Sequence, residues 1–216
     1  ARSLVYETYY LTQAFDYDLS RWRRIPGLGL LLPYAVLWWA CREYQRFHFY
    51  VDRGLLPPRA HGIFNQDELK LLSSLGKEIF FWTYGADVRT QARTRRLGEP
   101  NCCTDCPEPG RYCVCDENAG QAGYAAVKRH ATATFAMGDM QEYTPGSRND
   151  LFFWPLDLRA DGGRKYAPAY PDPSGEAPLR IVHASNHRIF KGTRFLIQAV
   201  EKLKREGLPL DLALVE

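Results

Sequence analysis

The sequence carries little excess charge of either sign. Its 28 lysines and arginines against 25 aspartates and glutamates leave a formal net charge of +3 over 216 residues. A nucleic-acid-binding domain usually shows a clustered basic face, and this balance is too even to indicate one. We therefore expect no nucleic-acid partner.

The sequence also lacks an apolar run long enough for a spanning helix, which needs about 20 residues. Residues 25–41 come nearest, but they are fewer and include Pro33, which interrupts a helix. The run favours a helix buried against a sheet. The alternative is a helix lying in a membrane interface, with Arg21, Arg23 and Arg24 at the lipid phosphates.

No secretory signal peptide, fixed-period repeat or low-complexity tract is visible. The chain begins Ala-Arg-Ser and stops inside an apolar run at Glu216, so both ends read as cut, and we expect a piece of a longer polypeptide. The expected location is cytoplasmic, with peripheral membrane association left open.

Hydrophobic residues make up 45% of the chain and charged residues 25%, so a core of useful size can be buried. Aromatic residues reach 13%, which fits sugar-binding surfaces and core strands alike. Apolar runs alternate with helical segments, which predicts an α/β fold with a parallel sheet. Strands are expected at 3–10, 47–51, 78–83, 131–137, 151–154, 179–184 and 210–215, and helices at 28–43, 67–75, 119–130 and 193–206.

Residues 159–178 contain several prolines and glycines without apolar periodicity, which is typical of a linker. A fresh strand–helix–strand unit follows it. We therefore place a first domain at 1–160 with a cysteine-rich insertion at 101–117, a linker at 161–178, and the start of a second domain at 179–216.

Three loops follow predicted strands, where doubly wound sheets bind their ligands. In residues 84–89, Gly85 lets the backbone approach a ligand, and the Asp87 carboxylate could take a proton from an acceptor hydroxyl. Asp87 as the cap of a following helix is equally open. Asp139, after Gly138, favours a capping role, with a polar contact to an acceptor as the alternative.

The third loop, residues 183–193, places Arg188 and Lys191 just before a helix N-terminus. Backbone N–H groups and the helix dipole already favour an anion there. Cations oppose that dipole, so helix stability gives little reason for them. The pattern indicates a pocket for a diphosphate rather than solvated surface charge.

The segment LRIVHASNHRIFKGTRFLIQAVEKLKREGLPLDLALVE resembles the start of the donor domain in family-four-type retaining glycosyltransferases of the GT-B fold. In that family an arginine and a Lys-Gly pair in this loop contact the donor diphosphate, which implies this role for Arg188, Lys191 and Gly192. EIFFWTYGADVR resembles the acceptor-side strand with its Gly-x-Asp loop. FHFYVDRG resembles an earlier strand with an embedded histidine, here His48, and FFWPLDL the segment before the interdomain linker.

The resemblance implies two Rossmann-like domains, the first nearly complete and the second truncated, and no essential catalytic metal. It implies Asp87 as the catalytic residue. The expected acceptor-side residues are Tyr84, Gly85, Asp139 and His48, although a histidine in a strand is more often a satisfied core residue. Tyr84 stands where many relatives have histidine. The usual Gly-rich first strand is missing and the paired-glutamate motif lies beyond Glu216, so this piece alone is expected to be inactive.

Five of the six cysteines fall between Cys102 and Cys115. Cys103-x-x-Cys106 followed by Cys113-x-Cys115 resembles a structural zinc knuckle. Cys102 in place of Cys103, two disulfides, and a redox or iron–sulfur site are the alternatives. Four thiolates would close the coordination sphere, so a catalytic zinc is not expected.

The expected function is transfer of a hexose from a nucleotide-diphosphate sugar to a glycan or lipid-linked acceptor. A nucleotide-sugar epimerase of the same architecture is a second enzymatic hypothesis. The rival from another class is a non-catalytic, zinc-stapled module that recognises a glycan or a protein. Absence of the paired-glutamate motif from the longer chain would favour the module.

Overall fold

The computed structural model describes residues 2–7, 15–58, 64–150, 177–185 and 187–215. The protein is a mixed α/β chain with parallel sheets, as the sequence predicts. It divides into two compact units, one formed by Ala1–Thr90 with Cys113–Phe152 and the other by Gln91–Tyr112 with Phe153–Glu216. The predicted strand at 151–154 and residues 161–176 of the predicted linker lie outside the described residues.

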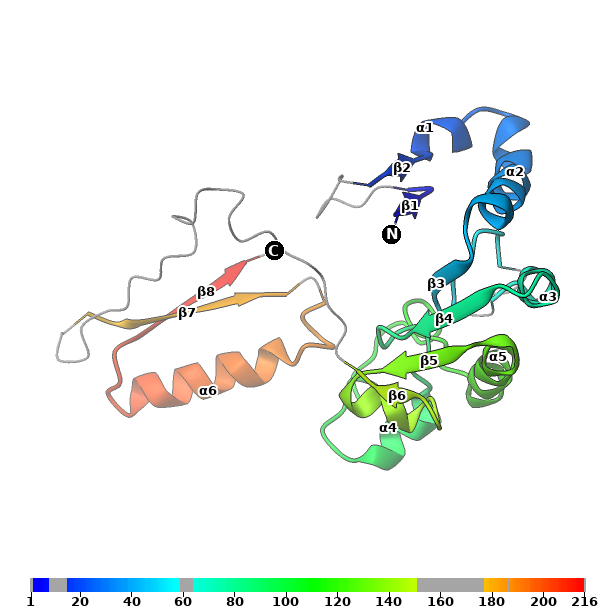
Figure 1. Ribbon diagram of the computed structural model, residues 1–216. Coiled ribbons are helices and arrows are strands. Elements are labelled where there is room, and N and C mark those ends of the chain that lie inside the picture. The colour runs from blue at the N-terminus through cyan, green and yellow to red at the C-terminus, as the bar shows by residue number, and fades with distance from the viewer. Residues whose placement is uncertain (1, 8–14, 59–63, 151–176, 186, 216) are drawn as a thin grey trace. The chain divides into compact units, whose positions relative to one another are not determined.

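The first unit is built on a four-stranded parallel sheet in the order β3-β4-β5-β6 (Figure 1). The strands are β3 (Arg46–Tyr50), β4 (Glu78–Trp82), β5 (Ala133–Ala136) and β6 (Arg148–Asn149). Tyr50 pairs with Trp82, so the carboxyl ends of β3 and β4 are level. The strand order does not reverse within this described sheet, whereas a doubly wound fold binds its ligand at such a reversal.

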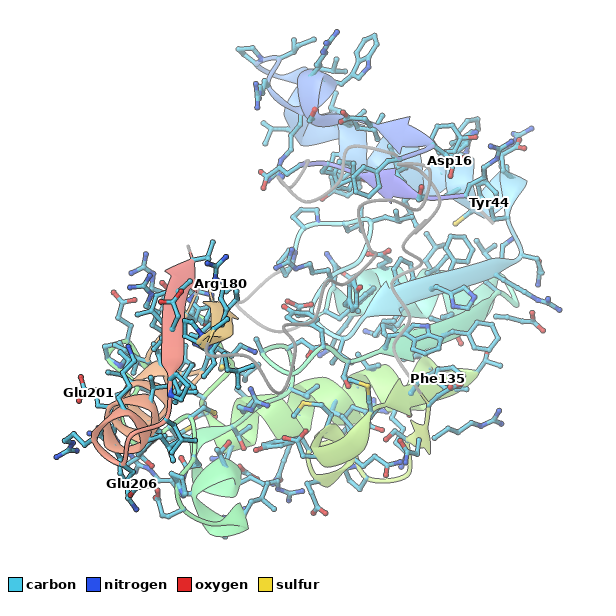
Figure 2. All side chains as sticks on the ribbon, turned by 90° about the vertical axis from the view of Figure 1, so that its left-hand side faces the viewer. Asp16, Tyr44, Phe135, Arg180, Glu201 and Glu206 are labelled. Carbon is cyan, nitrogen blue, oxygen red and sulfur yellow. The ribbon has the colours of Figure 1, made fainter. Side chains whose placement is uncertain are left out.

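One face of this sheet carries the core. Helices α3 (Gln66–Ser74) and α5 (Glu117–His130) cover it, as expected for right-handed crossovers between adjacent parallel strands. Side chains alternate along each strand, so Phe47, Ile79 and Phe81 pack with Leu69, Leu72 and Val127 of the helices. The other face presents an aromatic row of His48, Phe80, Trp82 and Phe135, the last labelled in Figure 2.

Local capping explains where these helices begin. The Asn65 side chain accepts hydrogen bonds from the N–H groups of Asp67 and Glu68 at the start of α3. Asp116 accepts from Ala119 N–H at 2.6 Å at the start of α5. Such caps satisfy orphan N–H groups in the first turn. Both predicted helices are confirmed, with ends shifted by one or two residues.

Glu68 on α3 is a fully buried carboxyl group inside the core. Its two oxygens accept hydrogen bonds from the N–H groups of Leu55 and Leu56, at 2.8 and 2.9 Å. Burial raises its pKa to about 7, against the lowering effect of those two N–H groups. Glu68 therefore ties α3 to the segment that follows β3.

We expect the free energy of unfolding to rise as the pH falls from about 8 towards 5. Glu68 has a folded-state pKa of about 7 against an ordinary 4.5, so the folded protein holds the proton more tightly across that window. One such group gives a slope of at most about 1.4 kcal/mol per pH unit. Urea unfolding at several pH values should show the slope, and Glu68→Gln should reduce it. The control is Glu206→Gln at an exposed glutamate, which should leave the slope unchanged. An unchanged slope in Glu68→Gln would contradict the assignment.

The N-terminal segments of this unit form a separate strand pair and two helices. Strands β1 (Leu4–Val5) and β2 (Tyr17–Asp18) pair in parallel, and α1 (Ser20–Arg23) leads into α2 (Leu28–Glu43). The expected buried helix is buried on one side only: its inner side chains are Val36, Leu37 and Ala40. Among the described residues, no helix is long and apolar enough to cross a membrane.

The second unit contains the predicted strand–helix–strand segment. Strand β7 (Leu179–Ala184), helix α6 (Thr193–Arg205) and strand β8 (Leu210–Val215) follow one another, and β7 pairs with β8 in parallel (Figure 1). Helix α4 (Gln91–Leu97) also belongs to this unit. The predicted unit is confirmed, including its helix end near Gly207.

Candidate functional site

The loop after β4 holds Asp87 in a fixed orientation. Its Oδ1 accepts hydrogen bonds from the N–H groups of Tyr84 and Gly85, at 3.0 and 2.9 Å. The loop turns at Gly85, whose φ of 112° favours glycine. Asp87 therefore closes its own loop and does not cap the helix that follows, which begins only at Gln91.

A second carboxylate approaches from the neighbouring strand. Asp52 lies two residues beyond β3, and its Oδ2 accepts a hydrogen bond from the Tyr84 hydroxyl at 2.9 Å. Arg53 donates to the same oxygen at 3.3 Å. Because β3 and β4 end level, these groups share one edge of the sheet. Tyr84 thus bridges the two loops.

The Asp87 carboxyl is 3% exposed. Burial, and after it the negative charge of Asp52, raise its pKa to about 7, although backbone N–H groups act in the opposite direction. Its Oδ2 atom, like Oδ1 of Asp52, has no hydrogen-bond partner among the residues that the structure describes. A carboxyl group in this state can accept a proton near neutral pH.

Asp139 follows β5, the strand next to β4, and contacts the loop that holds Asp87. It lies in a short helical turn, η1 (Gly138–Glu142), which follows β5. Its carboxylate pairs with the Arg89 guanidinium at 3.6 Å. A Cβ atom on Gly85 would stand 3.6 Å from that guanidinium. Tyr84, Gly85, Asp87 and Asp139, which the sequence indicates separately, are therefore brought together, with Asp139 in an ion pair.

His48 is placed differently. It lies in the middle of β3, where its Nδ1 accepts a hydrogen bond from Trp82 Nε1 at 3.2 Å and its ring stacks on Phe80. Burial, with a smaller effect of Arg46, lowers its pKa. These contacts belong to the aromatic row of the sheet rather than to the loops at its edge.

The second unit forms a cationic loop before α6. Gly192 caps the helix in the left-handed conformation, with φ of 67°. Lys191 and Arg188 are held in the turn by their backbones, since Lys191 N–H donates to the His187 carbonyl and the Arg188 carbonyl accepts from Thr193 N–H, both at 3.0 Å.

Three features favour an anion at this helix start. The first turn of α6 has no acidic residue, whereas Glu201 and Glu206 lie towards its other end (Figure 2). The Ser185 hydroxyl, at the end of β7, is buried and has no partner within the described residues. The first N–H groups of a helix point towards its start. Together with Lys191 and Arg188 these groups suit a phosphate.

The cysteines do not form a metal centre in this structure. Within the described part of the chain, no three His, Cys, Asp or Glu residues are arranged to hold a metal ion. Cys102, Cys103 and Cys106 belong to the second unit and Cys113 and Cys115 to the first. Structural zinc on Cys103, Cys106, Cys113 and Cys115 stays a prediction, and no step below depends on it.

The segment around Cys115 has another role in the first unit. Its backbone N–H donates to the Arg89 carbonyl at 3.2 Å, and Val114 N–H donates to Ala86 at 3.2 Å. Cys115 itself has a positive φ of 62°, which is uncommon for a residue other than glycine. This segment therefore flanks the Asp87 loop and holds the backbone of that loop through these two hydrogen bonds.

Sequence reasoning missed Asp52, Arg53, Arg89 and Ser185. Asp52 follows its strand as Asp87 follows β4, so the same signal could have found it. Arg89 stands within the loop quoted for Asp87, and Ser185 within the loop quoted for Lys191. Their contribution depends on which strands are neighbours, which the local pattern does not contain.

Comparison with known proteins gives no match, whether with protein-family models, with curated proteins or with solved structures. The chemistry of the two sites is the evidence for function. One offers a buried proton acceptor at a sheet edge, and the other a cationic helix start.

Proposed function

We propose that the chain is the acceptor-side part, with the first strand–helix–strand unit of the donor-binding part, of a glycosyltransferase that uses a nucleotide-diphosphate sugar. The observation that carries the proposal is the Asp87 carboxyl, which is buried, has a pKa of about 7, and keeps one oxygen without a partner in the described residues. Such a group is matched to taking a proton from a hydroxyl at neutral pH.

The loop before α6 supplies the second requirement. Charge develops on the leaving diphosphate as its bond to the sugar breaks, and fixed cations and helix N–H groups stabilise that charge. Lys191, Arg188 and the Gly192 cap provide them. The resemblance of this segment to the donor domain of family-four-type retaining glycosyltransferases supports the same assignment.

In the proposed reaction the acceptor oxygen forms a bond to the anomeric carbon of the sugar. The bond from that carbon to the diphosphate breaks, and the nucleoside diphosphate leaves with the electron pair. The hydroxyl proton passes to Oδ2 of Asp87. Tyr84 and Asp52 position the loop through the 2.9 Å hydrogen bond that joins them. The resemblance implies a two-domain GT-B architecture and retention of configuration.

The test is release of free nucleotide from a panel of UDP-, GDP- and ADP-sugars, followed by mass spectrometry. Because the resemblance places further donor contacts beyond Glu216, the assay uses the full-length natural protein. One donor should release nucleotide, and Lys191→Ala should weaken donor binding by about tenfold to a hundredfold through loss of a charged hydrogen bond. The matched control is Lys204→Ala, on the last turn of α6. No release, and no thermal stabilisation by any donor, would contradict the proposal and favour a binding module.

A further inference from the structure

Helix α2 exposes an apolar stripe on the side opposite the core. Leu30, Leu31, Tyr34 and Trp38 are 78%, 67%, 58% and 64% exposed. They recur at the three- and four-residue spacing that aligns side chains along one side of a helix. We call these four residues the outer face of α2. A helix that is apolar on both sides needs a second apolar environment, and contiguous exposed apolar patches mark interaction surfaces.

The turn before α2 extends this apolar surface. Trp22 and Ile25 are 55% and 46% exposed. The turn is packed against the first residues of α2, because a Cβ atom on Gly29 would meet the Arg23 carbonyl oxygen at 2.3 Å. The exposed tryptophans and tyrosine are the side chains that favour the boundary between water and lipid.

Cations stand at both ends of this surface. Residues 20–43 contain four arginines and one glutamate, a net charge of +3. Arg21, Arg23 and Arg24 precede the helix, and the Arg42 guanidinium stacks on the Trp38 ring at 4.8 Å. Arg21, Arg23 and Arg24 stand before the N-terminus of α2, where cations oppose the helix dipole, so they do not stabilise this helix.

We propose that the outer face of α2 binds the surface of an anionic phospholipid bilayer, with the helix lying in the plane of the interface. A helix of 16 residues is about 24 Å long. Arginines at both ends can reach lipid phosphates at once only if the helix lies flat. The apolar side chains then enter the boundary between headgroups and acyl chains. The inner side stays on the protein core through Val36, Leu37 and Ala40.

A second copy of the chain is a poorer partner for this face. A symmetric contact of α2 with itself would bring two segments of charge +3 together. Glu43 is already counted in that charge, and Glu7, which pairs with Arg23 at 2.6 Å, offsets one further arginine, so each segment still carries a net positive charge. Like charges in a contact are unfavourable. Anionic lipid offers the opposite sign over an extended plane.

The test is co-sedimentation of the chain with vesicles of phosphatidylcholine alone and of an equal mixture with phosphatidylglycerol. We expect binding to the mixed vesicles that weakens as salt is raised. The double variant Leu30→Ser with Leu31→Ser should bind about a hundredfold more weakly, since each leucine contributes about tenfold. Arg21→Gln and Arg24→Gln should each cost about fivefold, and Arg23→Gln should cost less because Arg23 already pairs with Glu7. Leu71→Ser on α3 and Lys204→Gln on α6 remove an exposed leucine and an exposed cation elsewhere, and should bind as the unchanged chain does.

Tryptophan fluorescence adds a readout of depth. Brominated lipids should quench the unchanged chain, and Trp38→Phe should lose part of that quenching. Either of two vesicle results would overturn the proposal: a chain that stays unbound with both vesicle compositions, or binding that the leucine and arginine variants do not reduce. A dimer in analytical ultracentrifugation that the leucine variant dissociates would also overturn it and assign the face to a second copy. None of these results depends on a sugar donor.

Discussion

Replacement of Asp87 by asparagine is expected to lower the rate of sugar transfer by about 10²- to 10⁴-fold, the usual contribution of a positioned general base. Asparagine keeps the loop closed, because its oxygen can still accept the Tyr84 and Gly85 N–H groups that Oδ1 of Asp87 accepts. The amide that replaces Oδ2 cannot take a proton. The measurement is steady-state transfer by the full-length natural protein, with the donor that the nucleotide-release panel identifies.

Two comparisons separate loss of a base from loss of structure. Asp18→Asn makes the same chemical change at an exposed carboxylate that accepts a hydrogen bond from Ser20 N–H at 2.9 Å, and it should leave the rate unchanged. The melting temperature of Asp87→Asn should not fall. If that variant transfers sugar at the original rate, Asp87 is not the base, and the proton must leave by another route.

The pH profile gives an independent check of the same assignment. With a pKa of about 7 for Asp87, transfer should slow as the pH falls below 7, because the protonated carboxyl cannot act as a base. The charge of Asp52 is the second cause of that raised pKa. Asp52→Asn should therefore lower the pKa of Asp87 and move the acidic limb to lower pH. If the acidic limb of the profile does not move in Asp52→Asn, burial alone raises the pKa of Asp87.

The pairing of Asp52 with the Asp87 loop shows what sequence reasoning can and cannot reach. A continuous apolar run predicts β4, and Asp87 follows at the end where ligands bind. Asp52 and Asp87 are distant in sequence, and they become neighbours because Tyr50 lies opposite Trp82 in the sheet. Strand order and register are properties of the whole chain, and the local pattern does not contain them.

Helix α2 shows the same division between local and global information. Its apolar residues predict a helix, and the helix forms with a limit at Glu43, as expected. Which side of α2 is buried depends on its contacts with the sheet and with the N-terminal strands. Trp39 contacts Tyr17 and Tyr44 through edge-to-face rings at 4.9 and 5.5 Å. Trp38, one residue earlier, faces outward, and composition alone cannot distinguish the two.

Gly54→Ala is expected to destabilise the first unit by about 4 kcal/mol, which combines overpacking with loss of buried hydrogen bonds. A Cβ atom at this position would stand 2.3 Å from Oε2 of Glu68 and 2.4 Å from Cζ of Phe64. Phe64 is 2% exposed and Glu68 is fully buried, so neither can move into solvent. Displacing Glu68 would also remove the acceptors of the N–H groups that follow Gly54.

The control is a glycine whose constraint is its backbone conformation and not the space around a Cβ atom. Gly76 has a φ of 65° but nothing within 4 Å of a Cβ atom, so Gly76→Ala should cost only about 1–2 kcal/mol of backbone strain. Phe64→Leu shortens the side chain that the new methyl group meets. The double variant Gly54→Ala with Phe64→Leu should therefore be less destabilised than the sum of the two single variants. Urea unfolding followed by tryptophan fluorescence measures all four.

Gly54 also links the stability of this unit to its candidate site. It follows Asp52 and Arg53 directly, and the contact with Glu68 fixes where that segment leaves β3. If Gly54→Ala shifts the segment, Asp52 moves relative to Tyr84, and the pKa of Asp87 should fall as it does in Asp52→Asn. A Gly54→Ala variant as stable as the original chain would show that Glu68 and Phe64 can give way, and the tight packing inferred here would be wrong.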